Sequence, residues 1–201
     1  MKILVTGFEP WGKWSRNPSG DIAESLAGRS VGSYELVTGV LPVAFGKDIA
    51  AVRTLIQLHR PEAVVSLGLN GAARTLQVER VAVNLKVEEG EDLPVVEGGP
   101  AAYFATLPAR DMVESINGRG IEAGLSHSAG TFLCNHIMYS VLHFLESQQM
   151  NIPAGFIHLP PVPEQTEGKY GMDLSRTRTG VLAGLQSISS FLGKLSGVGV
   201  V

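Results

Sequence analysis

The sequence predicts an α/β fold, an open, mostly parallel twisted sheet with helices on both faces. Two observations lead to this prediction. Short apolar segments alternate with longer segments whose apolar residues recur every three or four positions. Strand-like segments such as Ala63–Leu67 are apolar throughout, which is typical of parallel strands that helices cover on both faces.

Each element follows from its local sequence. Apolar and β-branched residues between turn residues predict strands at Ile3–Thr6, Tyr34–Leu41, Ala63–Leu67, Val78–Leu85, Ala123–His127 and Gly155–Leu159. Helical spacing between start and stop signals predicts helices at Asn17–Leu26, Gly46–His59, Arg110–Asn117, Leu133–Ser147 and Leu174–Leu195, the last interrupted by Gly180 and Gly184. Gly68–Ala73 is predicted as a turn, Glu88–Pro100 as a mobile loop and Pro160–Gly171 as a polar loop.

The composition fits one domain that spans residues 1–201. A chain of 201 residues, 44% hydrophobic and 17% charged, can bury a sizeable core. The net charge of −3 provides no basic surface, so neither nucleic acid nor a membrane is expected as a partner. No signal-peptide pattern follows Met1, and a single cysteine fits a reducing compartment, so we expect a cytoplasmic protein.

The segment Ser128–His136 contains the only cysteine of the chain, Cys134. A lone thiol cannot form an intramolecular disulfide, so it is either a small buried apolar residue or a reactive group. A turn of small residues precedes it, and apolar residues at helical spacing follow it. This places Cys134 in the first turn of a helix, where free backbone N–H groups favour a thiolate and can stabilise an oxyanion.

A reactive thiol needs a base, and the chain offers five histidines: His59, His127, His136, His143 and His158. His158 ends a short apolar strand, and function gathers at the carboxyl ends of strands in open α/β sheets. His136 is expected to point about 200° away from Cys134 on the same helix, toward its solvated or partly packed back. His127 is the second choice.

A third group should orient the base, and Glu79 is the candidate. Period two in the strand Val78–Leu85 puts Glu79 on the same face as Val81 and Val83. A carboxylate on an apolar face is unfavourable unless it is paired. An ordinary salt bridge on the strand would satisfy the same pattern. A catalytic role for Glu79 is favoured only because Cys134 and His158 need an orienting acid.

Several further motifs occur in one order along nearly the whole chain. They are Lys2–Gly12, Asn17–Ser19, Leu41–Val43, Gly68–Gly71, Glu79–Asn84, Gly98–Phe104, Ser128–His136 and Gly155–Pro160. With these motifs the chain resembles the pyroglutamyl peptidase I (pyrrolidone-carboxylate peptidase) family of cysteine peptidases. The resemblance implies that the chain removes N-terminal pyroglutamyl residues from peptides, without a cofactor, as a homodimer or homotetramer.

The resemblance also implies site residues. Cys134, His158 and Glu79 fall on the positions of the family's Cys–His–Glu triad. Phe8 and Trp11 match the two aromatics beside the pyroglutamyl ring. Leu69 matches the main chain that binds the lactam, and Phe132 and Leu133 match another pocket wall. Trp14 is expected outside this pocket.

One segment departs from the family pattern. After Asn84, relatives usually have an Ala-Arg-Ile-Pro-Asp-Asn-like loop, whereas this chain has the shorter, acidic Leu85–Pro94, which includes Glu88–Pro94. This departure leaves open another thiol hydrolase of the same fold, acting on a different acyl or amide substrate.

Two more alternatives have weaker support. Dinucleotide binding is disfavoured, because the Gly7–Gly12 turn does not have the GxGxxG motif. A binding protein without catalysis does not explain why all three triad positions are kept. Histidines, cysteine and acids show no metal-ligand spacing, so no metal is expected.

Overall fold

A seven-stranded sheet forms the centre of the computed structural model, which describes residues 1–12 and 14–197. Its strands follow the spatial order β10 (Ala123–Ser126), β5 (Leu76–Glu79), β11 (Ala154–Leu159), β4 (Ala63–Leu69), β1 (Lys2–Phe8), β3 (Tyr34–Leu41) and β2 (Ser30–Val31). The four central strands, from β11 to β3, run parallel.

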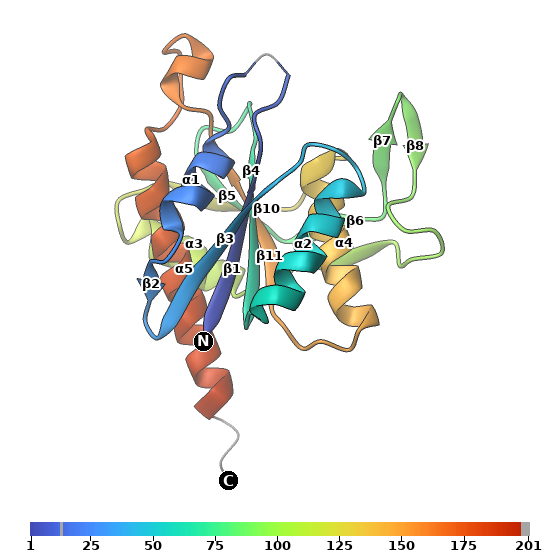
Figure 1. Ribbon diagram of the computed structural model, residues 1–201. Helices are drawn as coiled ribbons and strands as arrows, with labels where there is room; N and C mark the ends of the chain where they lie inside the picture. The colour runs from blue at the N-terminus through green and yellow to red at the C-terminus, as the bar shows by residue number, and fades with distance from the viewer. Residues whose placement is uncertain (13, 198–201) are drawn as a thin grey trace.

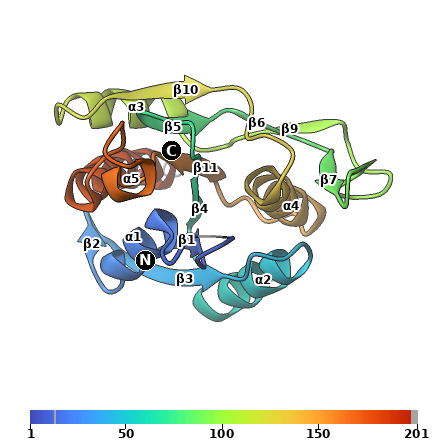
Figure 2. The ribbon, with the colours of Figure 1, turned by 90° about the horizontal axis from the view of Figure 1, so that it is seen from above.

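Helices cover both faces of this sheet (Figures 1 and 2). One face packs against α1 (Pro18–Leu26), α3 (Ala109–Asn117) and α5 (Leu174–Gly197), and the other against α2 (Lys47–His59) and α4 (Leu133–Ser147). Each face has its own apolar cluster, so the strands between them are buried on both sides. The α/β fold predicted from the sequence is confirmed.

The prediction of one continuous strand over Val78–Leu85 is wrong, because two strands occupy this segment. The first part belongs to β5, which ends at Glu79, and β6 (Val81–Val83) leaves the main sheet to pair with β9 (Ala102–Phe104). Glu79 is therefore not in one continuous strand with Val81 and Val83, and Val83 is exposed. The strand β5 also runs antiparallel to β11, which the sequence did not reveal.

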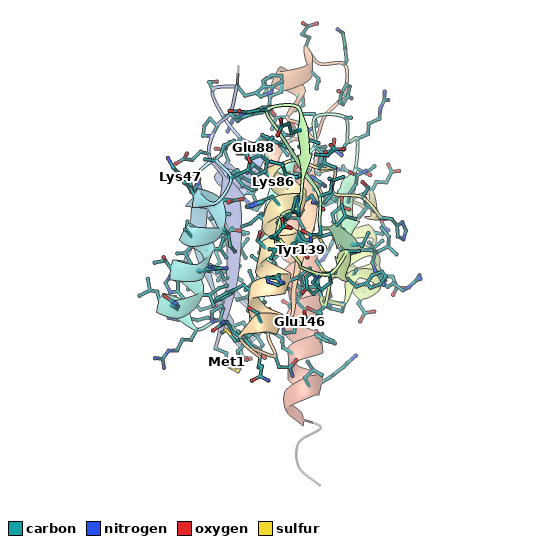
Figure 3. All side chains as sticks on the ribbon, turned by 90° about the vertical axis from the view of Figure 1, so that its right-hand side faces the viewer. Met1, Lys47, Lys86, Glu88, Tyr139 and Glu146 are labelled. Atoms are coloured by element: carbon teal, nitrogen blue, oxygen red, sulfur yellow. The ribbon has the colours of Figure 1, made fainter. Side chains whose placement is uncertain are left out.

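The predicted loop Glu88–Pro100 is also wrong in part, because a hairpin begins just before it. Strands β7 (Lys86–Glu88) and β8 (Glu91–Leu93) pair across Glu89 and Gly90, both of which have positive φ. Positive φ at both central residues is the geometry of the tightest hairpin turns. Lys86 and Glu88 form an ion pair on this hairpin, beside α4 (Figure 3).

The other differences are smaller. Helix α5 continues through both Gly180 and Gly184, where the sequence predicted interruptions. Gly180 allows the helix to pack closely on β5, since a Cβ there would lie 2.4 Å from Leu76 Cδ1. The polar loop after β11 contains a short 3₁₀ helix, η1 (Pro163–Thr166). None of the helices in the described part of the chain combines the length and apolarity that a membrane crossing requires.

Candidate active site

The three residues predicted as a triad meet at one end of the sheet. Helix α4 begins at Leu133, so Cys134 lies in its first turn, as the sequence predicted. His158 lies near the end of β11 and Glu79 ends β5. His158 Nδ1 lies 2.7 Å from Glu79 Oε1, and the same imidazole hydrogen-bonds Cys134. Glu79 is 0% exposed and His158 is 5% exposed, so water screens this pair little.

The antiparallel register explains why Glu79 reaches His158. Residue His158 pairs with Gln77, and Ile157 pairs with Val78. Glu79 is thus two residues along β5 from the direct partner of His158, on the same face of the sheet. Diagonal neighbours of this kind lie within reach of long side chains.

Burial and hydrogen bonding act in opposite directions on His158. Burial alone lowers the pKa of the imidazole, but hydrogen bonds to Cys134 and Glu79, together with the charges of both, raise the pKa from 6.5 to about 9. The imidazolium form is therefore favoured at neutral pH. Among the described residues Glu79 Oε2 has no hydrogen-bond partner, so the contact with His158 is the one that stabilises this buried carboxylate.

The start of α4 leaves backbone donors beside the thiol. Its N-cap residue is Phe132, and no side chain in the described part of the chain caps this end. The first intrahelical bond runs from His136 N to Phe132 O, so the N–H groups of residues 133–135 have no partner within the helix. Such N–H groups can bind a developing oxyanion.

Gly68 brings the backbone of β4 against the thiol. A Cβ at this position would lie 2.8 Å from Cys134 Sγ and 2.5 Å from Phe156 Cζ. Both distances are below the separation that real Cβ atoms tolerate. Any other residue at this position would displace Phe156, Cys134 or β4.

Asn135 is a site residue that the sequence reasoning missed. Its buried side chain accepts a hydrogen bond from Val83 N and donates to Val83 O and Leu85 O, each at 2.9 Å. These bonds fasten the segment that follows Glu79 to the turn that carries Cys134. An asparagine directly after the cysteine, at the start of the helix, was the signal that could have pointed to it.

A cavity of about 180 Å³ opens beside Cys134. The five predicted pocket residues line it, namely Phe8, Trp11, Leu69, Phe132 and Leu133. The rings of Trp11 and Phe132 pack together with centroids 5.3 Å apart.

Trp14 also lines the cavity, so the prediction that it lies outside the pocket is wrong. The loop before α1 turns back on itself, with Trp14 N bonded to Trp11 O, and this brings both indoles to the cavity.

The other histidines lie elsewhere. His136 is not on a solvated or partly packed surface as expected, because it is buried with Nδ1 2.7 Å from Asp48 Oδ2 of α2. His127 follows β10 and is exposed. His143 Nδ1 bonds the hydroxyl of Tyr103. The described residues contain no group of three or more His, Cys, Asp or Glu side chains that could hold a metal ion.

Comparison with known proteins agrees with this geometry. A family model described as pyroglutamyl peptidase matches residues 1–189. The chain belongs to the pyroglutamyl peptidase family. The predicted family is therefore confirmed. Its activity, removal of N-terminal pyroglutamate by a cysteine peptidase, is confirmed with it.

Relatives of the family match nearly the whole chain. The pyrrolidone-carboxylate peptidase of Gloeobacter violaceus is 41% identical over 94% of this chain and 98% of its own length, and that of Bacillus cereus is 38% identical over 89% and 88%. Among solved structures, pyroglutamyl peptidase I of Bacillus amyloliquefaciens has a TM-score of 0.90 at 33% identity, covering 94% of this chain and 97% of that one. The pyrrolidone carboxyl peptidase of Thermococcus litoralis has a TM-score of 0.90 at 33% identity, covering 96% and 95%.

Proposed function

We propose that this chain hydrolyses the amide bond after an N-terminal pyroglutamyl residue, with Cys134 as nucleophile, His158 as acid and base, and Glu79 as the group that orients His158. The observation that carries the proposal is the contact chain from Cys134 through His158 to Glu79, next to a cavity the size of one small ring. A nucleophile, a base and an orienting acid in hydrogen-bond sequence are the parts that acyl transfer requires.

The first step forms a thioester. The Cys134 thiolate attacks the carbonyl carbon, and the oxyanion is stabilised by free N–H groups at the start of α4. His158 Nδ1 is engaged with Glu79, so Nε2 faces the thiol and donates its proton to the departing amine nitrogen as the C–N bond breaks. A pKa of about 9 keeps that proton available at neutral pH.

The second step releases pyroglutamate. A water molecule attacks the thioester carbonyl while His158 Nε2 accepts its proton. The C–S bond breaks, and the Cys134 thiolate and the His158 imidazolium are restored together. Glu79 holds the imidazole in one orientation throughout and stabilises its charged form.

The walls of the ring pocket support a substrate without charge. Phe8, Trp11, Phe132 and Leu133 present apolar surface, and main-chain groups near Leu69 are the polar partners for the lactam. The charge of Arg16, which also lines the pocket, is paired with Asp21 at 2.8 Å. An ammonium group buried there without a partner is unfavourable, so free N-terminal proline, glutamate and glutamine are excluded.

The second candidate is a thiol hydrolase of the same fold with another acyl or amide substrate. Its support is the short acidic segment Leu85–Pro94, which forms a hairpin tied by Val87 N to Thr131 O, close to Cys134. Rates on the chromogenic amides of pyroglutamate, proline and alanine separate the two. We expect hydrolysis of the pyroglutamyl amide and little of the others, and comparable rates on prolyl and pyroglutamyl amides would favour the second candidate.

The same proposal covers the organisation of the protein. We expect one catalytic domain over residues 1–201, of which residue 13 and residues 198–201 lie outside the described part of the structure. A cytoplasmic location fits a reactive thiol. A homodimer or homotetramer is supported by exposed apolar side chains at Phe104 and Leu195, which line one hollow. Light scattering on the purified protein measures the oligomeric state.

A further inference from the structure

A second groove, of about 280 Å³, adjoins the ring pocket. The two share Trp14, Leu69 and Gly71. The opposite wall comes from the loop after β11, where Pro161 and Tyr170 line the groove. This loop carries η1 and lies at the same end of the sheet as the loop before α1 (Figure 1). The proposed hydrolysis assigns it no task.

The walls of this groove are held in place by contacts between distant segments. The Tyr170 hydroxyl donates a hydrogen bond to Gly71 O at 2.8 Å, and the Arg74 guanidinium lies 5.2 Å from the centre of the Tyr170 ring. Gln165 Nε2 donates to Arg16 O at 3.2 Å, which ties the loop after β11 to the loop before α1. A groove that is already formed loses less conformational freedom when a ligand binds.

The position of the groove fits the part of the substrate that leaves. The ring pocket, at about 180 Å³, is smaller than the roughly 300–1,000 Å³ of pockets that hold drug-sized ligands, so it takes one small ring. The rest of the peptide starts at the carbonyl between Cys134 and His158. Three residues after His158 the chain reaches Pro161, inside the groove.

The groove also has a definite chemistry. Trp14, Tyr170, Leu69 and Pro161 give it flat apolar surfaces, two of them aromatic, and Gln165 and Thr166 add polar groups. Its two charged lining residues, Glu167 and Lys169, are exposed and pair with each other at 2.9 Å, so their charges offset one another. Aromatic side chains bind such surfaces by stacking in addition to apolar burial.

We infer that this groove binds the residue that follows pyroglutamate and favours an aromatic or large apolar side chain there. The inference rests on the proposed pyroglutamyl hydrolysis and adds a specificity-determining residue, Tyr170, to it. Because the groove contacts only the leaving part, it changes the rate with longer peptides and leaves the chemistry at the thiol unchanged.

The test compares three substrates: pyroglutamyl amide with ammonia as leaving group, pyroglutamyl-glycyl-alanine and pyroglutamyl-phenylalanyl-alanine. We expect the unaltered protein to show a kcat/KM about three- to tenfold higher with the phenylalanyl than with the glycyl peptide, the range of one aromatic contact. Tyr170→Ala should bring this ratio close to one, and its kcat/KM with pyroglutamyl amide should match that of Tyr170→Phe, because both variants lose the hydrogen bond to Gly71. Tyr170→Phe keeps the ring and should keep most of the preference. Leu58→Ala, which truncates an exposed apolar side chain on α2 that lines neither the pocket nor the groove, is the control.

Two results would overturn the inference while the proposed function stands. One is an unaltered protein that hydrolyses both peptides at equal kcat/KM. The other is a Tyr170→Ala variant that loses the same factor with all three substrates, since this would show a general effect on the ring pocket. Failure of the unaltered protein to hydrolyse any of the three would instead contradict the proposed function, and with it the groove's occupant.

Discussion

Asp48 and His136 form a buried pair with the same geometry as Glu79 and His158. In both pairs Nδ1 of a histidine that is 5% exposed lies 2.7 Å from an oxygen of a carboxylate that is 0% exposed. The surroundings differ, because among the described residues only His158 bonds Cys134, and only Asp48 accepts a further hydrogen bond, from Ile49 N at 2.8 Å. The molecule therefore contains its own control for the effect of removing a buried imidazole.

His158→Ala and His136→Ala should separate catalysis from stability. Each removes the partner of a buried carboxylate, which costs about 3–5 kcal/mol of unfolding free energy. His158→Ala should also lower kcat/KM for a pyroglutamyl amide by about 10²–10⁴-fold, because the acid and base is lost. His136→Ala should retain kcat/KM within about tenfold when assayed well below its unfolding temperature. Denaturant unfolding and steady-state kinetics measure the two effects, and a larger kinetic loss in His136→Ala would mean that His136 is the base.

Cys134→Ser should fold normally and lose about 10³-fold or more in kcat, because a hydroxyl is far less nucleophilic than a thiolate with the same base. In the unaltered protein, iodoacetamide should label Cys134 with one equivalent and abolish turnover. Circular dichroism provides the folding control. Undiminished turnover by a folded Cys134→Ser variant would exclude a thiol mechanism.

The pH dependence follows from the raised pKa of His158. Folding raises the pKa from 6.5 to about 9, so the stabilisation of the imidazolium is complete below about pH 6.5 and is lost as pH rises through about 9. We expect kcat/KM to fall above about pH 9, where His158 can no longer protonate the leaving amine. Glu79→Gln removes the carboxylate charge and should move this limb to lower pH.

The control for this profile is the unfolding free energy across the same pH range. It should decline between about pH 6.5 and 9 in the unaltered protein and decline less in Glu79→Gln. An alkaline limb that Glu79→Gln does not move would show that another group controls it.

Gly68→Ala should damage catalysis through geometry alone. The added methyl would lie 2.5 Å from Phe156 Cζ and 2.8 Å from Cys134 Sγ, so these side chains or β4 must shift. A displacement of about 1 Å can lower a rate about 10²-fold, and we expect kcat to fall by that order. Gly124→Ala on β10 is the matched control, because a Cβ there meets nothing within 4 Å. Equal kcat in both variants would mean that the site tolerates the shift.

Trp11→Ala should raise KM for pyroglutamyl amides by about tenfold, because the indole forms a wall of the ring pocket and packs on Phe132. Trp14→Ala should raise KM less, because the Trp14 side chain is shared between the ring pocket and the adjoining groove, so less of it contacts the ring. Leu58→Ala, which truncates a side chain that is 69% exposed and lines neither the pocket nor the groove, should leave KM unchanged. The order of the three KM values is the readout, and an effect of Leu58→Ala equal to that of Trp11→Ala would remove the support for this pocket.

Local sequence determined the elements whose signals are local. Helix α4 begins and ends where apolar spacing predicted, at Leu133 and Ser147, because a small-residue turn precedes a regular helical pattern. The position of Cys134 in the first turn follows directly. The strands β1, β4 and β11 were also predictable, since continuous apolar runs are typical of strands that are covered on both faces.

Other features were decided only by the tertiary structure. The break of the predicted strand at Arg80 and the antiparallel pairing of β5 with β11 depend on partners that local periodicity does not specify. Glu79 was identified with the help of an incorrect face argument, and it reaches His158 through the diagonal register instead. Asn135 and the place of Trp14 likewise depend on where distant loops fold back.

The sequence by itself thus determined the residue types of the site, the helix that presents the thiol and the family. The tertiary structure alone decided that His136 is buried in a pair with Asp48, and that Glu79 reaches His158 through the antiparallel register of β5 and β11. The physical reason is that a histidine's chemistry is encoded locally, whereas its partners come from segments 79 and 88 residues away, Glu79 for His158 and Asp48 for His136.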